Sequence, residues 1–279
     1  MKETEKIYRF LIWDSYDSSN RIITHNEIKL NNPEPWNAED YGEWKLPFDW
    51  WENEDKINNK LYERAAIEVM TIGIETLEVV DVEEHYNNLK LAFWDTKNLD
   101  KLESEFFDEL YACTGAFCTS VEWDNVKMWE TWGNLGEGYC VGLNLSELRK
   151  VEKLRGLNSP VNYYSSNSIP KISIFEPKTL ENTIGDFHKQ LFSVPARLDY
   201  EKEFRFTKIN SDEKGFPYPY TTDDRIVKLP ISCYDSIYFG YEISSQDKQE
   251  ILNCIDVLLP DVKKFQLSYE NKRLLINPE

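Results

Sequence analysis

The chain has 279 residues, of which 41% are apolar and 14% aromatic, so it can bury a sizeable core in one domain or two. Its formal net charge of −18 argues against non-specific nucleic-acid binding, because an acidic surface repels phosphate backbones. The chain has no run of about 18 uncharged apolar residues and no apolar segment at its start, so we expect a cytoplasmic protein with no membrane association.

The first half of the chain is predicted to contain one strand, an ordered loop region and two helices. Residues 6–13 predict a strand that is apolar on both faces except for Arg9, and a lone arginine there needs a partner or a ligand. Residues 25–51 are rich in Asn, Pro and Trp and predict ordered loops. Residues 55–80 and 97–111 have apolar positions at helical spacing.

The second half is predicted to be richer in strands. Residues 138–145 and 161–164 predict strands, 147–154 a short helix with Ser146 as its N-cap, and 179–192 a longer helix. After a loop over 210–224, strands are predicted over 225–231, 236–240, 262–267 and 274–276, with a helix from Ser244 or Ser245 to residue 258. The clustering of strands predicts an α+β fold, with a mixed or mostly antiparallel sheet flanked by helices in a single compact domain covering 1–279.

Residues 198–206, with the sequence LDYEKEFRF, carry the most informative pattern in the chain. Their alternation predicts a strand with Glu201, Glu203 and Arg205 on one face. Side chains two apart on a strand lie about 7 Å from each other, so the carboxylates repel unless a cation lies between them, and such clusters are often functional. A structural alternative is an edge strand whose charges face water, with Arg205 paired to Glu203.

Familiar catalytic and metal-binding motifs are missing from the sequence. It contains no nucleotide-binding loop, hydrolase, zinc-protease or kinase signature, and the glycines between 133 and 142 are explained by a tight turn into a strand. Five cysteines without CxxC spacing and three scattered histidines predict reduced thiols and no bound metal. Cys118 has no histidine near it in sequence, so a buried thiol is a commoner interpretation than a nucleophile.

Four motifs follow one another in the order and spacing of the bacterial family called domain-of-unknown-function 2971. They are Tyr8-Arg9, FCTS at 117–120, Met128-Trp129 followed by 138–145, and YEKEFR at 200–205. The chain resembles this family over nearly its whole length. It departs from the family pattern where Ala38-Glu39 follows Asn37 and where Trp132 and Leu198 replace the usual Tyr and Trp.

The order of an arginine, a serine-containing strand and Glu-x-Glu is also similar to the Arg-Ser-Glu pattern of ADP-ribosyltransferases. This resemblance implies an ADP-ribosyltransferase-like fold with NAD as substrate. It implies that Arg9 holds the NAD phosphates or ribose, and that Ser120, with Thr119 beside it, supports the final carboxylate. Glu203 would hydrogen-bond the nicotinamide ribose, and Glu201 would orient or deprotonate the acceptor.

The same resemblance implies a physical reason for a carboxylate at Glu203 and further residues that would bind NAD. Breaking the N-glycosidic bond builds positive charge on the ribose, and a fixed carboxylate nearby lowers that barrier. Trp129 or Tyr8 would stack on the nicotinamide, and Arg205 is included among the cofactor-binding residues.

Two classes of function stay open. The first is an NAD-consuming transferase acting as an intracellular toxin or phage-defence effector, and a cleft joining Arg9, Ser120 and Glu203 would indicate it. The second is a non-catalytic binding or sensor module of a defence or stress system, with a basic protein partner or antitoxin, and a flat aromatic surface without a pocket at Glu203 would indicate it. A nuclease using Glu201 and Glu203 as metal ligands ranks last, because it lacks a supporting Asp or His and conflicts with the acidic charge.

Overall fold

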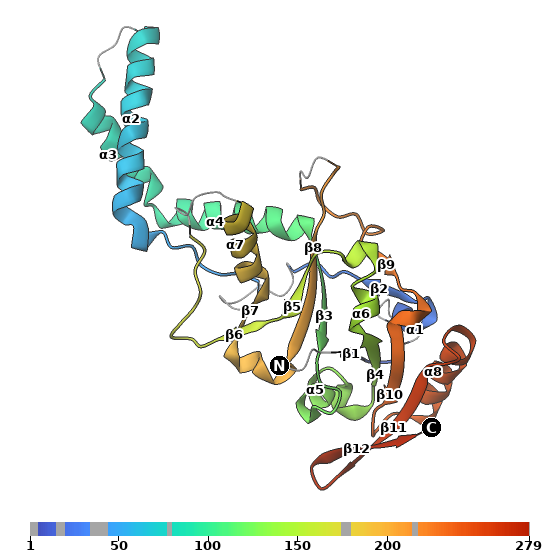
Figure 1. Ribbon diagram of the computed structural model, residues 1–279. Coiled ribbons are helices and arrows are strands. Elements are labelled where there is room, and N and C mark those ends of the chain that lie inside the picture. The colour runs from blue at the N-terminus through green and yellow to red at the C-terminus, as the bar shows by residue number, and fades with distance from the viewer. Residues whose placement is uncertain are drawn as a thin grey trace.

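A mixed sheet of eight strands runs through the molecule (Figure 1). The computed structural model describes residues 5–14, 20–33, 44–76, 80–173, 180–213 and 217–278. The strand order is β12-β11-β10-β4-β1-β3-β8-β5, and neighbours are antiparallel except for β10 and β11, whose parallel pairing needs the crossover helix α8 between them. The strands are β1 (Lys6–Leu11), β3 (Thr114–Ser120), β4 (Tyr139–Asn144), β5 (Leu157–Pro160), β8 (Glu203–Ile209), β10 (Tyr234–Phe239), β11 (Lys263–Glu270) and β12 (Arg273–Pro278).

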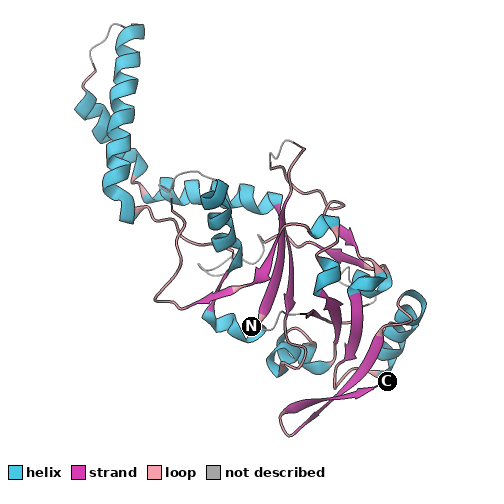
Figure 2. Cartoon of the chain, in the orientation of Figure 1, coloured by secondary structure: helices cyan, strands magenta, loops and turns pink. Residues whose placement is uncertain are grey.

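Helices and two small strand pairs surround this sheet (Figure 2). The α-helices are α1 (Arg21–Thr24), α2 (Glu54–Thr76), α3 (Val82–Phe93), α4 (Thr96–Cys113), α5 (Val126–Thr131), α6 (Leu145–Leu148), α7 (Leu180–Phe192) and α8 (Ser245–Leu258). The 3-10 helices are η3 (Trp51–Asn53), η4 (Asn134–Gly136), η5 (Glu152–Leu154), η6 (Ala196–Glu201) and η7 (Ile231–Cys233). The small pairs are β2 (Glu27–Lys29) with β9 (Ile226–Lys228), and β6 (Asn162–Tyr164) with β7 (Ser193–Pro195). The predicted α+β fold with a mixed, mostly antiparallel sheet is confirmed.

The two faces of the sheet are covered differently. Strand alternation sends Ile7 and Leu11 to one face, where α1, α6, α8 and the β2–β9 pair complete one large core. On the other face the apolar residues form two separate clusters. Helix α5 covers Tyr8 and Phe10, while α4, α7 and Trp44 cover β3 and β8. Tyr8 and Phe10 of one cluster, and Cys118, which packs against the other, also line the pocket described below.

Helices α2 and α3 pack against each other and project from the body as an arm (Figure 1). The sequence pattern predicted one helix over 55–80 and missed α3. Helix α3 begins at Asp81, whose carboxylate accepts hydrogen bonds from the backbone N–H groups of Glu83 and Glu84. The described part of α2 ends at Thr76, and residues 77–79 lie outside the described residues. No described helix is both long and apolar enough to cross a membrane.

Several boundaries differ from the sequence prediction for local reasons. The predicted strand over 198–206 starts only at Glu203, because η6 occupies the preceding residues. The helix predicted over 147–154 is divided into α6 and η5, and Ser146 lies inside α6, where its hydroxyl bonds the Asn144 side chain. Helix α5, with Asn125 as its N-cap, was not predicted. By contrast, Ser244 caps α8 as expected, accepting from the N–H of Asp247 at 3.0 Å.

Two further differences from the sequence prediction are the short strands β2 and β5. The loop region expected over 25–51 contains β2, and Trp36 and Asn37 lie outside the described residues. Strand β5 was not predicted, although it pairs with β8 and places β8 inside the sheet. Because β8 is an interior strand, its residues Glu203 and Arg205 are buried.

Candidate functional site

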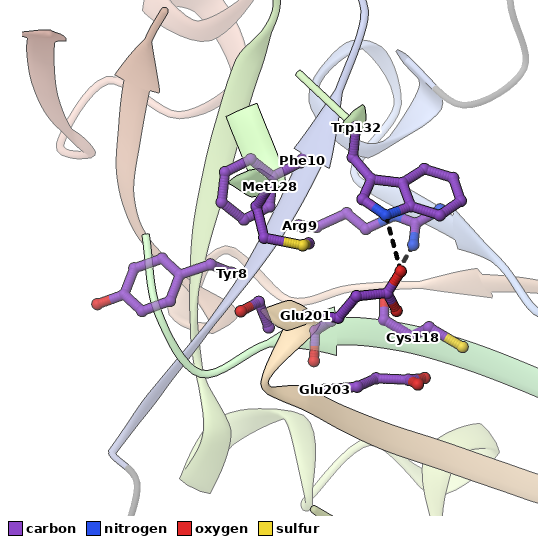
Figure 3. Close-up of a pocket in the computed structure, with 10 residues that line it drawn as sticks. Tyr8, Arg9, Phe10, Cys118, Met128, Trp132, Glu201 and Glu203 are labelled. Carbon is purple, nitrogen blue, oxygen red and sulfur yellow. Dashed lines mark hydrogen bonds between the residues drawn. The ribbon is translucent and has the colours of Figure 1, made fainter. Parts of the chain in front are cut away.

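A pocket opens on the second face of the sheet where β1 and β3 separate. In the described chain these strands share one register pair, Tyr8 with Ser120, and further along β3 Ala116 bridges Asn31 instead of β1. The pocket has a volume of about 200 Å³, below the roughly 300–1,000 Å³ typical of drug-sized ligands, so it suits one ring-bearing part of a ligand. Its lining residues are Tyr8, Arg9, Phe10, Cys118, Thr119, Ser120, Met128, Trp132, Glu201 and Glu203 (Figure 3).

Arg9 bridges the gap between the separating strands. Its Nη1 donates a hydrogen bond to the Cys118 carbonyl oxygen at 2.7 Å, and its guanidinium carbon lies 5.9 Å from the centre of the Phe117 ring. This bond uses one of five N–H donors, and the side chain still lines the pocket. Arg9 therefore has a structural partner and also offers positive charge to a ligand.

The two carboxylates reach the pocket from different elements. Glu201 is the last residue of η6 and Glu203 the first of β8, and Lys202 between them has left-handed backbone angles of φ 46° and ψ 47°. This conformation costs an L-residue roughly 1–2 kcal/mol, and functional sites often hold such strain. The prediction that Glu201, Glu203 and Arg205 share a strand face is wrong for Glu201, because Glu201 belongs to η6 and the strand starts only after Lys202.

Glu203 is held in a fixed orientation by Arg205. Arg205 donates from Nε to Oε1 at 2.7 Å and from Nη2 to Oε2 at 2.6 Å, and its Nη1 donates to the Leu191 carbonyl at 2.6 Å. Arg205 is fully buried, with its guanidinium 3.7 Å from the centre of the Trp44 ring. The pairing foreseen in the structural alternative is present, but on a buried interior strand and not on an exposed edge. Arg205 thus lies behind Glu203 and does not line the pocket.

The backbone of Glu203 has a further anchor. Its N–H donates to the Tyr163 hydroxyl oxygen at 2.8 Å. Burial raises the pKa of the Tyr163 phenol, and the charge of Glu203 adds to the rise, so the phenol stays protonated at neutral pH. The Glu203 side chain and backbone are therefore both fixed before any ligand binds.

Glu201 lies at the more open side of the pocket, next to Trp132. The indole N–H of Trp132 donates to Glu201 Oε1 at 3.1 Å, and Trp132 is 50% exposed. Figure 3 shows Arg9, Trp132 and Glu201 pointing toward one another, with Glu203 lying beside Cys118. A cation, an indole ring and a carboxylate thus meet where a ligand would enter.

The segment 118–120 contributes one wall of the pocket. Ser120 lies directly opposite Glu203 in the ladder between β3 and β8, and its Oγ accepts from the Glu122 N–H at 3.2 Å. Thr119 also lines the pocket, but its hydroxyl donates to the Phe204 carbonyl at 2.7 Å. Burial and the adjacent Glu203 carboxylate raise the pKa of the Cys118 thiol well above its usual range. Cys118 is therefore a protonated thiol at neutral pH and a poor nucleophile.

The two residues predicted to stack on the nicotinamide, Trp129 and Tyr8, have different positions relative to the pocket. Trp129 is fully buried, packs edge-on against Phe10 with 5.1 Å between ring centres, and donates its indole N–H to the Trp123 carbonyl at 2.7 Å. It does not line the pocket. Tyr8 does, but its hydroxyl points away from the other lining residues, and burial raises the pKa of its phenol (Figure 3).

Sequence reasoning missed Phe10, Met128 and Trp132 as lining residues. Met128 belongs to α5 and Trp132 follows its last residue, so both depend on a helix that was not predicted. The spacing of Trp129 and Trp132 could have indicated this helix, because residues three apart lie on the same side of a helix. One of the two can then be buried while the other lines a pocket. Phe10 follows Arg9 on β1 and gave no signal of its own.

The assembled pocket combines a guanidinium, two carboxylates, a serine hydroxyl and apolar ring walls. Among the described residues there is no group of three or more His, Cys, Asp or Glu side chains that could hold a metal ion. The polar groups suit hydroxyl and phosphate groups, and the walls suit a flat ring. Comparisons with protein-family models, with curated proteins and with solved structures return no match for this chain.

Proposed function

We propose that the pocket binds the nicotinamide and ribose end of NAD, and that the chain is an ADP-ribosyltransferase-like enzyme that cleaves the nicotinamide N-glycosidic bond. One observation carries this proposal: a single pocket gathers Arg9, Ser120 and Glu203, with Glu201 at its more open side. The resemblance to ADP-ribosyltransferases and to domain-of-unknown-function 2971 supports it.

The walls and size of the pocket support binding of a ring with an attached sugar. Phe10, Met128 and Trp132 supply apolar and aromatic contacts, and Trp132 is exposed enough to lie against a planar ring. A volume of about 200 Å³ leaves the diphosphate outside, on the side where Arg9 can pair with it. The adenosine end would extend over the surface beyond.

The two carboxylates have separate roles in the proposed reaction. As the bond between the ribose C1′ and nicotinamide breaks, its electron pair leaves with the ring, and positive charge develops on the ribose. Glu203, already fixed, accepts a hydrogen bond from a ribose hydroxyl and stabilises that charge. An acceptor nucleophile then attacks C1′ and passes its proton to Glu201.

The Arg205 pair favours a second candidate, a non-catalytic binding or sensor module. A bidentate arginine neutralises much of the Glu203 charge, so that carboxylate stabilises a developing cation less than a lone carboxylate would. The pocket at Glu203 is not the flat aromatic surface expected for such a module, so a module of this kind would bind NAD or a related nucleoside in the pocket itself without cleaving it. Either candidate suits a bacterial toxin, phage-defence effector or stress sensor, and a charge of −18 suits a basic protein partner or antitoxin.

Nicotinamide release from NAD by the purified chain, with cell extract as a source of acceptors, tests the proposal. We expect release by the wild type, a loss of about 100-fold in Glu203→Gln, and loss of transfer but not of hydrolysis in Glu201→Gln. Glu270→Gln is the matched control, because Glu270 is an exposed carboxylate at the end of β11. Circular dichroism and urea titration establish that each variant is folded.

Calorimetric titration with NAD separates the two candidates. Binding without release by the wild type supports the sensor module. If the wild type neither binds NAD nor releases nicotinamide, both candidates are refuted. Release that persists unchanged in folded Glu203→Gln and Glu201→Gln refutes the assignment of these residues.

A further inference from the structure

We propose that a groove at the base of the α2–α3 arm binds an arginine-containing apolar segment of a basic partner protein. This base groove has a volume of about 550 Å³ and lies apart from the pocket described above. Its lining residues are Trp51, Glu54, Asn87, Lys90, Leu91, Trp94 and Asp95. The inference concerns binding only and does not depend on the proposed enzymatic activity.

The floor of the groove is fixed by contacts within the chain. Trp51, in η3, stacks on Trp94, which follows α3, with 4.6 Å between ring centres. The indole N–H of Trp94 donates to the Asn58 side-chain oxygen at 2.9 Å, which ties the end of α3 to α2. Asp95 caps α4 by accepting from the N–H of Lys97 at 3.1 Å. The groove therefore exists before a partner binds.

The groove exposes large apolar side chains. Trp51 is 61% and Leu91 74% exposed, and no described side chain of α3 is buried. Two helices cannot cover all of their own apolar surface, and the arm stands away from the sheet, so the body does not cover the rest (Figure 1). Adjacent exposed apolar side chains beside a hollow are typical of protein interaction sites.

Charge identifies the partner as basic. The carboxylates of Glu54 and Asp95 lie in the groove, where Lys90 is the one cation among the described lining residues. Residues 54–93 of the sequence carry nine acidic and four basic side chains, a net −5. An arginine is the side chain that best combines contact with an indole face and hydrogen bonds to carboxylates. A second copy of this chain, at −18, would be repelled overall.

The partner segment is thus expected to place an arginine on the exposed face of Trp51, within reach of Glu54 or Asp95. Its apolar residues would then cover Leu91. Burying these two side chains supplies most of the binding free energy, and the carboxylates select arginine over uncharged residues.

Binding of a labelled peptide tests whether the base groove recognises arginine beside apolar residues. The probe is a 12-residue peptide of Arg, Leu and Ala, and its control has Glu in place of every Arg. Fluorescence anisotropy with the full chain measures the dissociation constant. We expect the Arg peptide to bind, the Glu peptide not to bind, and added NaCl to weaken binding.

A matched pair of variants distinguishes the groove from general attraction to an acidic protein. Leu91→Lys removes the apolar contact and adds a positive charge, and we expect it to weaken binding by about tenfold. Val257→Lys makes the same charge change at a 78% exposed position on α8, and we expect less than a twofold effect. Asp95→Asn removes the charge but keeps an oxygen for the helix cap, and we expect it to weaken binding by several-fold.

The following results would overturn the inference. Failure of the Arg peptide to bind, or equal weakening by Leu91→Lys and Val257→Lys, would show that the groove does not recognise it. Light scattering that finds a dimer of the wild type and a monomer of Leu91→Lys would assign the groove to a second copy instead.

Discussion

The pair of Arg205 and Glu203 makes a specific and severe prediction for stability. Arg205 is fully buried, and its guanidinium is used on three sides: by both Glu203 oxygens, by the Leu191 carbonyl and by the Trp44 ring. Replacement by methionine keeps most of the side-chain volume and removes all of these interactions at once. Glu203 would be left as a buried carboxylate without its cation.

The magnitude follows from the three losses. Removing one partner of a buried ion pair costs about 3–5 kcal/mol, an unsatisfied carbonyl about 1–3 kcal/mol, and a desolvated cation–π contact about 2 kcal/mol. These costs overlap because one group makes all three contacts, so we expect Arg205→Met to lower the free energy of unfolding by about 4 kcal/mol. Arg205→Lys keeps the charge but loses the planar guanidinium that bonds both Glu203 oxygens, and we expect it to lower the free energy of unfolding by about 2 kcal/mol.

Urea titration followed by circular dichroism measures these values. Arg64→Met is the matched control, because Arg64 is an exposed arginine paired with Glu68 on α2, and we expect its cost to be below about 0.5 kcal/mol. In the double variant Glu203→Gln with Arg205→Met no charge is left buried, so it should recover about 2 kcal/mol relative to Arg205→Met. A loss in Arg205→Met no larger than in Arg64→Met, or a double variant less stable than Arg205→Met, would refute this reasoning.

Two further predictions concern the walls of the pocket. Asn125 caps α5 through the N–H of Met128 and donates to the Tyr200 carbonyl of η6, so Asn125→Ala should lower the unfolding free energy by about 1–2 kcal/mol in urea titration. An unchanged stability would show that neither bond contributes. The raised pKa of Cys118 keeps its thiol protonated, so iodoacetamide should label it slowly at pH 7 and faster only well above pH 9. Mass spectrometry measures the labelling, and rapid modification of Cys118 at pH 7 would contradict the assignment.

Much of the fold follows from local patterns in the sequence. The strands β1, β4 and β10 have short apolar runs, and the helices α4 and α8 have apolar positions at helical spacing and an N-cap residue. All five occur close to where these patterns predict them. Short elements escaped prediction. Helix α5 has six residues and η6 is a 3-10 helix, and over such lengths a few apolar positions fit a helix and a strand equally well.

The candidate site, too, was predictable only where it depends on local sequence patterns. The sequence by itself singled out Arg9 as a lone cation in an apolar strand, and Glu203 with Arg205 as neighbours on a strand face, because side-chain alternation is a local property of the backbone. It could not distinguish a solvated edge from a buried interior strand, since that depends on β5 pairing with β8 from more than 40 residues away in the chain.

Tertiary structure decided which groups meet in the pocket. The separation of β1 from β3, the left-handed Lys202 and the depth of Trp129 compared with Trp132 all depend on how distant segments pack. A one-residue change of helix position moves a side chain by about 100°, so whether a tryptophan enters the core or the pocket is set by packing and not by its neighbours in sequence. The sequence thus determined which chemical groups are present, and long-range contacts determined which of them share one space.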